Sequence, residues 1–314
     1  MRPGFPRRRA GAGACQRLAA VSRTITIPPD TQLAPLLRGY AAAVAAKRRR
    51  LLLGFAVLAV CVLVAGAGAE VNADKFWSGI GNFGDYFNRL LLLDSGARVW
   101  TDPADWFWGL RRWGRLLGET LLIAYVGTLT GTLGAFVGCF LCSRNLVRAA
   151  GLRMAVRRVL EFCRTVPDIV FALIFVASFG LGAIPGVLAI AIHTTGALGK
   201  LFAEVVENID MKPVEGVAAT GGSWFAQVRF GALPQVLSNF ASYALLRLEI
   251  NVRGATIIGV VGAGGIGQDL IVAIRQFHTS DVSAILLLIV LCVMVIDAAS
   301  ERLRHRLLAM EQRR

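Results

Sequence analysis

The polar residues best placed to do chemistry in this sequence lie within an apolar stretch, residues 236–262. Arg247, Glu249 and Arg253 occur near the middle of that stretch. In the centre of a lipid bilayer, a charged side chain costs at least about 2.5–3.5 kcal/mol unless it is paired or hydrated. Because Glu249 and Arg253 are four residues apart, they share one helix face and can form an ion pair. A helix with charges on two sides cannot face lipid, so we expect this helix in the centre of an assembly.

These charges are compatible with two roles, and the sequence leaves both open. Either the helix lines a path for a solute, in which Arg253 or Arg247 meets an anionic substrate, or Glu249 and Arg253 form a buried pair that orients neighbouring helices. His193, in an earlier apolar stretch, either makes a structural hydrogen bond or contacts the substrate. The candidate path residues are His193, Arg247, Glu249, Asn251, Arg253 and Thr256.

A glycine-rich run follows the same stretch. Its spacing matches the GxGxxG fingerprint of dinucleotide-binding loops, but that fingerprint requires a preceding strand in a βαβ unit, and an apolar helix is expected here. A flexible, closely packed turn on the periplasmic side is the better interpretation. The glycines of this turn are Gly262, Gly264, Gly265 and Gly267.

Catalysis and metal binding are not expected from the remaining residues. Cys139 and Cys142 form a CxxC pair, but no second pair or nearby histidine completes a zinc site. The three histidines lie far apart, and the sequence contains no HExxH motif. The sequence therefore predicts no catalytic residue, no metal site and no cofactor bound by this chain.

Composition indicates an all-α, polytopic membrane protein. Of 314 residues, 55% are hydrophobic and 17% are charged, and the mean hydropathy is +0.60. A soluble domain carries about a quarter charged residues, and a helix needs about 20 apolar residues to cross a bilayer. Six spans are predicted, at residues 51–69, 120–142, 166–183, 184–203, 236–262 and 282–299.

The distribution of basic residues predicts the orientation of the chain. The net charge of +14 is concentrated in residues 1–50, 143–165 and the segment after 300, whereas residues 70–115 are balanced. By the positive-inside rule, the basic segments are cytoplasmic, which places both termini and the loop 204–235 inside the cell. Nucleic-acid binding is not needed to explain the charge.

The chain thus divides into five predicted parts. The segment 70–115 contains five of the six tryptophans and an apolar stripe at helical spacing, so it either lies in the outer membrane interface or packs on the spans. The parts are a basic, mostly disordered tail (1–50), a first transmembrane helix (51–69), the interfacial helices (70–115), a transmembrane core (116–300) with the loop 204–235, and a second basic tail (301–314).

The loop 204–235 contains residues at an ordered spacing. A glutamate is followed six residues later by a glycine and, twelve residues beyond that, by Leu-Pro. A folded, polar segment at this place predicts a docking surface for a soluble partner; the alternative is an amphipathic connector of coincidental composition. The candidate docking residues are Glu215, Ala219, Gly221, Leu233 and Pro234.

This spacing resembles the EAA loop of ABC importer permeases. Stretches at 164–170, 188–207 and 249–267 also resemble the permease subunit of bacterial phosphonate ABC transporters, and the resemblance covers roughly residues 115–300. The loop departs from the usual pattern at Gly216 and Val217, where Ala-Ala is usual, and at Gly231, where an aliphatic residue is usual. Because glycine inside a helix costs about 1 kcal/mol relative to alanine, we expect a less rigid first docking helix.

The resemblance implies a methionine-permease-like core in the bacterial inner membrane. It also implies a permease homodimer, two cytoplasmic ATPases, which bind ATP and Mg²⁺, and a periplasmic substrate-binding protein. ATPase closure on the loop 204–235 would then switch the spans between outward and inward access. The Walker A pattern GxxxxGK[ST] is absent from this chain, as a separate ATPase requires.

The substrate implied by the resemblance is phosphonate or a related small phosphorus oxyanion. Alternatives within the same class are importers of phosphite, phosphate esters or methionine. A stand-alone secondary carrier is a different class, but such carriers usually contain two related halves, and no clear internal repeat occurs here. A membrane-embedded enzyme would require nucleophile or metal-ligand clusters in the spans, and the sequence contains none.

Overall fold

The computed structural model describes residues 30–69, 73–93 and 95–311. It separates into two compact units, Met1–Ile80 and Gly81–Arg314. All regular elements among the described residues are helices, which confirms the predicted all-α class. Residues 1–29 of the predicted N-terminal tail lie outside the described residues.

The first unit consists of α2 (Asp30–Gly68) and the beginning of α3 (Ala73–Leu90). Helix α2 contains the first predicted span, but it begins well before residue 51. The prediction of a mostly disordered tail is therefore wrong for residues 30–50. The alanine-rich sequence at 41–46 explains the difference, because alanine is the best helix former and this stretch runs directly into the apolar span.

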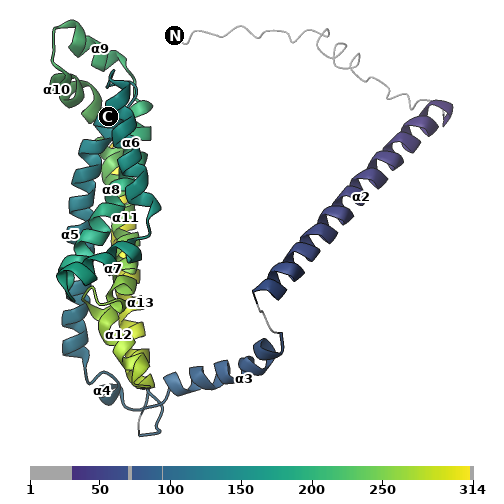
Figure 1. The fold of residues 1–314 in the computed structure, drawn as a ribbon, viewed down its shortest axis with the longest axis vertical. Helices are drawn as coiled ribbons and strands as arrows, with labels where there is room; N and C mark the ends of the chain where they lie inside the picture. The colour runs from purple at the N-terminus through teal and green to yellow at the C-terminus, as the bar shows by residue number, and fades with distance from the viewer. Residues whose placement is uncertain (1–29, 70–72, 94, 312–314) are drawn as a thin grey trace, which may run out of the picture. The chain divides into compact units, whose positions relative to one another are not determined.

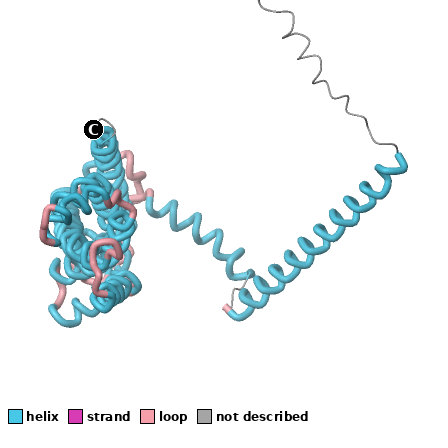
Figure 2. Tube along the Cα trace, turned by 90° about the horizontal axis from the view of Figure 1, so that it is seen from above, coloured by secondary structure: helices cyan, strands magenta, loops and turns pink. Residues whose placement is uncertain are grey.

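The second unit is a bundle whose long helices lie side by side, as Figure 1 shows and as the end-on view in Figure 2 confirms. Its centre is α8, which packs against α5, α6, α7 and α11. Its elements are α4 (Pro103–Trp106), α5 (Leu110–Cys142), α6 (Ala150–Thr165), α7 (Asp168–Phe179), α8 (Ala183–Glu207), α9 (Lys212–Ala219), α10 (Trp224–Ala226), the π-helix η1 (Gln227–Ala232), α11 (Leu233–Val260), α12 (Ile266–Arg275) and α13 (Thr279–Glu311).

Four described helices are long and apolar enough to cross a membrane: residues 37–68, 110–142, 183–207 and 279–306. Helix α11 has the necessary length but carries the three charges discussed above.

The third predicted span, 166–183, is not one long helix. Helix α7 has 12 residues and is therefore only about 18 Å long. Helix α6 precedes it across Pro167, and the two lie against successive parts of α8. Leu160 of α6 lies beside Gly199, whereas Phe171 of α7 belongs to the same buried cluster as Ile190. The basic residues at 148–164 lower the hydropathy of α6, so a hydropathy profile does not show that this helix also packs along α8.

Small residues let α5 approach α8 closely. A Cβ atom added to Gly127 would lie 2.8 Å from Ile190, and one added to Gly131 would lie 2.6 Å from Thr194. The glycine spacing in α5 thus serves packing within one chain.

Three buried apolar clusters follow one another along the bundle. The first surrounds the stacked rings of Phe202 and Phe240, whose centroids are 3.9 Å apart. The second contains Ile190 and Ile258, and the third contains Trp113 at the far end. The core of the bundle is therefore divided into three clusters, and α11 contributes residues to the first two.

Candidate functional site

The predicted docking segment forms a short helix that ends in a well-defined cap. Helix α9 buries Val214, while Glu215 and Ala219 are exposed. Gly221 has φ = 81°, the N–H of Gly221 donates to Ala218 (3.0 Å), and the N–H of Gly222 donates to Val217 (3.1 Å). This is a Schellman cap, in which glycine is the favoured left-handed residue.

The two glycines that depart from the EAA pattern have different environments. A Cβ atom on Gly231 of η1 would lie 2.8 Å from the Cα atom of Val214, so this glycine lets η1 contact α9 directly. A Cβ atom on Gly216 would have no heavy atom within 4 Å. The glycine at position 231 therefore has a packing reason, whereas the glycine at position 216 weakens α9 without one.

Hydrogen bonds attach this segment to the bundle at two points. The indole N–H of Trp224 donates to the carbonyl of Leu146 (3.1 Å) in the loop after α5. The Gln235 amide accepts from the N–H of Asp210 (3.1 Å) and donates to the carbonyl of Asp210 (3.0 Å). Leu233 is half-buried in the first core cluster, and Pro234 is exposed at the start of α11. A force on α9 or α10 is thus transmitted to the ends of α5, α8 and α11.

The charged residues of α11 pair with α13 instead of with each other. Glu249, whose exposed fraction is 7%, binds Arg304 at 2.8 Å, and Arg253 binds Asp297 at 2.7 Å. The predicted pair between Glu249 and Arg253 is therefore wrong. Residues on α13 lie opposite each of them, and such inter-helix pairs hold two elements together.

Asn251 is a buried hydrogen-bonding hub. Its amide nitrogen donates to the hydroxyls of Thr128 on α5 (2.8 Å) and Thr194 on α8 (2.9 Å), and its exposed fraction is 3%. Thr256, one turn further along α11, is half-buried and bonds weakly to the carbonyl of Val252 (3.5 Å). The amide of Asn251 thus ties three helices together inside one chain.

His193 lies beside the break between α6 and α7. Its Nδ1 atom lies 3.1 Å from the carbonyl oxygen of Val166, so a protonated Nδ1 donates there. Pro167 follows directly and has no N–H, so helical hydrogen bonds are lost at this break. His193 replaces one of them, which is the structural role that the sequence left open.

Arg247 differs from the other arginines of this region. Its buried Nε atom has no hydrogen-bond partner among the described residues, as is also true of the Nε atom of Arg304, but Arg253 and Arg304 bind carboxylates through their terminal nitrogens. Asp168, the first residue of α7, is the acidic residue that acts on Arg247 electrostatically. A guanidinium with unused donors beside a helix break is suited to a small anion.

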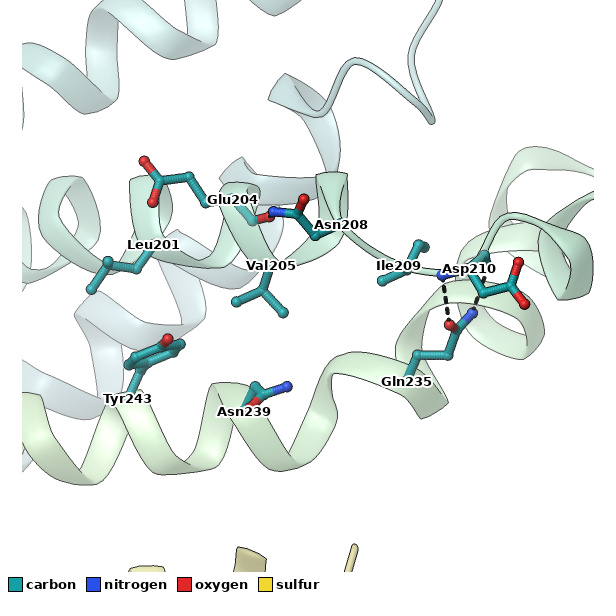
Figure 3. Close-up of a pocket in the computed structure, with 9 residues that line it drawn as sticks. All are labelled: Leu201, Glu204, Val205, Asn208, Ile209, Asp210, Gln235, Asn239 and Tyr243. Atoms are coloured by element: carbon teal, nitrogen blue, oxygen red, sulfur yellow. Dashed lines mark hydrogen bonds between the residues drawn. The ribbon is translucent and has the colours of Figure 1, made fainter. Parts of the chain in front are cut away.

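A groove lies between α8 and α11. Its volume is about 480 Å³. In Figure 3, Leu201 and Val205 of α8 point towards Tyr243 and Asn239 of α11, and Gln235 closes one end beside Asp210. Arg247 follows Tyr243 by one helical turn on α11.

The glycine-rich turn is buried and tightly enclosed. Gly262, Gly264 and Gly265 have φ values of 93°, 81° and 77°, which only glycine adopts readily. A Cβ atom on Gly267 would overlap the carbonyl oxygen of Thr256. The turn packs against the start of α5, since the N–H of Ile266 donates to the hydroxyl of Thr120 (2.9 Å).

The sequence interpretation missed the partners of these residues. Asp297 lies in the last predicted span, where a lone carboxylate in an apolar run signals a buried partner. Arg304 was assigned to the basic tail, and Thr128 and Thr194 give no charge signal at all. Pairing across helices depends on their relative rotation, which a single sequence does not specify.

Comparison with known proteins identifies the family. Residues 131–308 match the family described as the binding-protein-dependent transport system inner membrane component. This chain belongs to that family. It is therefore a multi-pass membrane protein and the permease component of an ABC importer.

Two relatives indicate the branch of the family. The permease is 40% identical over 202 residues to the phosphite transport system permease protein PtxC of Stutzerimonas stutzeri, covering 64% of this chain and 73% of PtxC. It is also 40% identical over 164 residues to the phosphate-import permease protein PhnE of Mycolicibacterium smegmatis, covering 52% of this chain and 31% of that protein. These relatives confirm the predicted resemblance to permeases of phosphorus oxyanion transporters.

The fold is shared with a solved importer. The permease of the MetNI methionine ABC transporter, in an inward-facing conformation, superposes with a TM-score of 0.56 at 21% identity, covering 66% of this permease and 98% of that chain. The predicted methionine-permease-like core is therefore confirmed as a fold. The identity is too low for the likeness to indicate a shared substrate.

Proposed function

We propose that this permease imports phosphonate or a related small phosphorus oxyanion. The observation that carries the proposal is the 40% identity to the phosphite permease PtxC over 73% of its length. Two copies of this chain form the path, and a periplasmic binding protein delivers the substrate. The chain itself has no catalytic role, because ATP and Mg²⁺ bind to the separate ATPase.

The segment 204–235 is proposed as the contact with that ATPase. Helix α9 presents an exposed face around Glu215 and Ala219, and its capped end at Gly221 fixes the direction of the next segment. The bonds from Trp224 and Gln235 connect it to the bundle. In this proposal the segment and both termini are cytoplasmic, as the basic residues predict.

Arg247 is proposed as the residue of the path that meets the oxyanion. It combines a guanidinium, which matches phosphoryl oxygens in geometry and charge, with donors that are not used within the described chain. Glu249, Asn251 and Arg253 are engaged with neighbouring helices and are proposed to hold the path together. His193 supports the helix break beside it.

Uptake measurements test the substrate. A strain that lacks this permease is complemented with wild type and supplied with phosphonate, phosphite, a phosphate ester or orthophosphate as sole phosphorus source. Growth on one of these oxyanions is expected, and Arg247→Gln should lower uptake more than tenfold, since a charge-assisted contact contributes about 1.5–3 kcal/mol. Arg253→Gln is the matched control and should lower uptake less. Rescue of methionine uptake alone would refute the oxyanion proposal.

Co-purification tests the coupling to an ATPase. Wild type in mild detergent should bring down the ATPase subunit, and Gly221→Asp should abolish this, because a side chain at φ = 81° disturbs the cap. Gly96→Asp, at an exposed glycine with the same φ of 81° outside the 204–235 segment, serves as the control for a charged side chain in a left-handed turn and should leave the ATPase bound. Recovery of the permease alone, with ATP-independent transport, would instead favour a secondary carrier.

A further inference from the structure

The turn between α12 and α13 contains a residue in an unfavourable conformation. Phe277 has φ = 60° and is the one non-glycine residue with a positive φ within residues 30–69, 73–93 and 95–311. Any residue with a Cβ atom is disfavoured in this left-handed region. Such outliers persist where the surrounding structure enforces them, and they are frequent at functional positions.

The hydrogen bonds of the turn show why the conformation is left-handed. The N–H of Phe277 donates to Ile274 (3.2 Å), and the N–H of His278 donates to Ala273 (3.1 Å). This is the same Schellman cap that ends α9, where the equivalent residue is Gly221. Glycine would therefore remove the strain at position 277 without changing the turn.

The phenyl ring gains nothing from the fold in exchange. Its exposed fraction is 86%, the highest among the large exposed apolar side chains of the described residues. Both the left-handed backbone conformation of Phe277 and the exposure of its phenyl ring to solvent are unfavourable for an isolated chain. A contact outside the chain is the physical reason left for a phenylalanine here.

The surroundings of Phe277 have the composition of a protein interface. Figure 1 places α4 and α12 at the opposite end of the bundle from α9 and α10. A cleft of about 180 Å³ lies beside the turn and is lined by Trp108, Gln276, His278 and the ion pair of Arg112 with Asp269. Trp108 has an exposed fraction of 63%. A projecting aromatic ring next to a polar cleft with tryptophan and arginine is typical of an interface centre.

We infer that Phe277 is the anchor by which the substrate-binding protein docks on this permease, with the adjacent cleft receiving a side chain of that protein. This inference rests on the proposed function, since the end opposite α9 faces the periplasm only if α9 contacts the ATPase. The left-handed backbone fixes the direction of the Cα–Cβ bond, along which the ring projects, before binding, and this lowers the entropy lost on docking.

Lipid is a less suitable occupant for this ring. Fluid lipid adapts to any direction of an exposed side chain, so a strained backbone brings no advantage there. The flanking residues Arg275, Gln276 and His278 are exposed and polar, which fits the rim of a protein contact better than an apolar membrane anchor.

The substitution Phe277→Gly separates docking from folding. The complete transporter is placed in nanodiscs, and its affinity for the substrate-binding protein of the same system is measured with bound oxyanion. The variant should bind about 30-fold more weakly, as expected for loss of an aromatic hot spot, while its melting temperature stays equal or rises. Phe277→Tyr should retain binding, and Ile274→Ala, with an exposed fraction of 42%, controls for loss of apolar surface nearby.

The possible outcomes distinguish this inference from the proposed function. If wild type binds the substrate-binding protein and Phe277→Gly binds equally well, the anchor is refuted but the importer is not. If the variant keeps binding but is no longer stabilised against thermal unfolding by lipid, the ring is a membrane anchor and the inference is wrong. A lower melting temperature with unchanged binding would show that the ring supports the fold. Failure of wild type to bind would refute the proposed function itself.

Discussion

Two glycines of α9 should respond to alanine in opposite ways. Gly216 lies inside the helix with open space around it, so Gly216→Ala should stabilise α9 by about 1 kcal/mol through helix propensity alone. Gly221 has φ = 81°, so Gly221→Ala should destabilise the cap by about 1–2 kcal/mol. The two variants should therefore differ by about 2–3 kcal/mol in local stability, although each adds the same methyl group.

Hydrogen exchange of the α9 amides in nanodiscs measures this difference directly. A helix of 8 residues is marginal on its own, so its amides exchange through local opening, and 1 kcal/mol changes the open population about fivefold. Exchange should slow about fivefold in Gly216→Ala and accelerate by at least as much in Gly221→Ala. If both variants shifted exchange in the same direction, the assignment of Gly221 to a left-handed cap would be wrong.

The remaining predictions concern the bundle. Glu249→Gln should lower stability by about 2 kcal/mol, because Arg304 loses its partner, and Arg304→Met in the same chain should restore most of the melting temperature. Asn251→Ala should cost about 1–2 kcal/mol in thermal unfolding, through two lost inter-helix hydrogen bonds and a small cavity. Gly267→Ala should prevent accumulation of folded permease in membranes, whereas Gly254→Ala, with ordinary contacts only, should accumulate normally.

The fold class could be predicted from the sequence because the apolar runs are long and their boundaries are marked by basic residues. The broken third span could not, because the arginines of α6 hide a helix that packs along α8. The hydropathy of a segment indicates whether lipid or water surrounds it. Pro167 divides this segment into two helices that lie in different environments. The helical start of α2 was not predicted for a related reason. Its basic residues indicated a solvated tail, whereas its alanines favour a helix.

The candidate site was predictable in composition but not in pairing. The polar residues of α11 could be recognised by their cost in a membrane. Whether Glu249 contacts Arg253 or Arg304 depends on the rotation of α13 about its axis. The residue spacing on α11 does not specify this rotation. The strain at Phe277 had no sequence signal either, because only the hydrogen bonds of the turn make its backbone left-handed.

The two ion pairs between α11 and α13 also set a limit on sliding. To these two pairs each helix contributes one negative and one positive residue, and the helices run in opposite directions, so that Glu249 faces Arg304 and Arg253 faces Asp297. Translation of α13 by about 6 Å, four residues of helix rise, would bring Asp297 level with Glu249. Like charges about 4 Å apart repel by roughly 4 kcal/mol at an effective dielectric constant of 20. The alternating signs thus oppose sliding of α11 and α13 past each other and favour movement of these two helices as one unit.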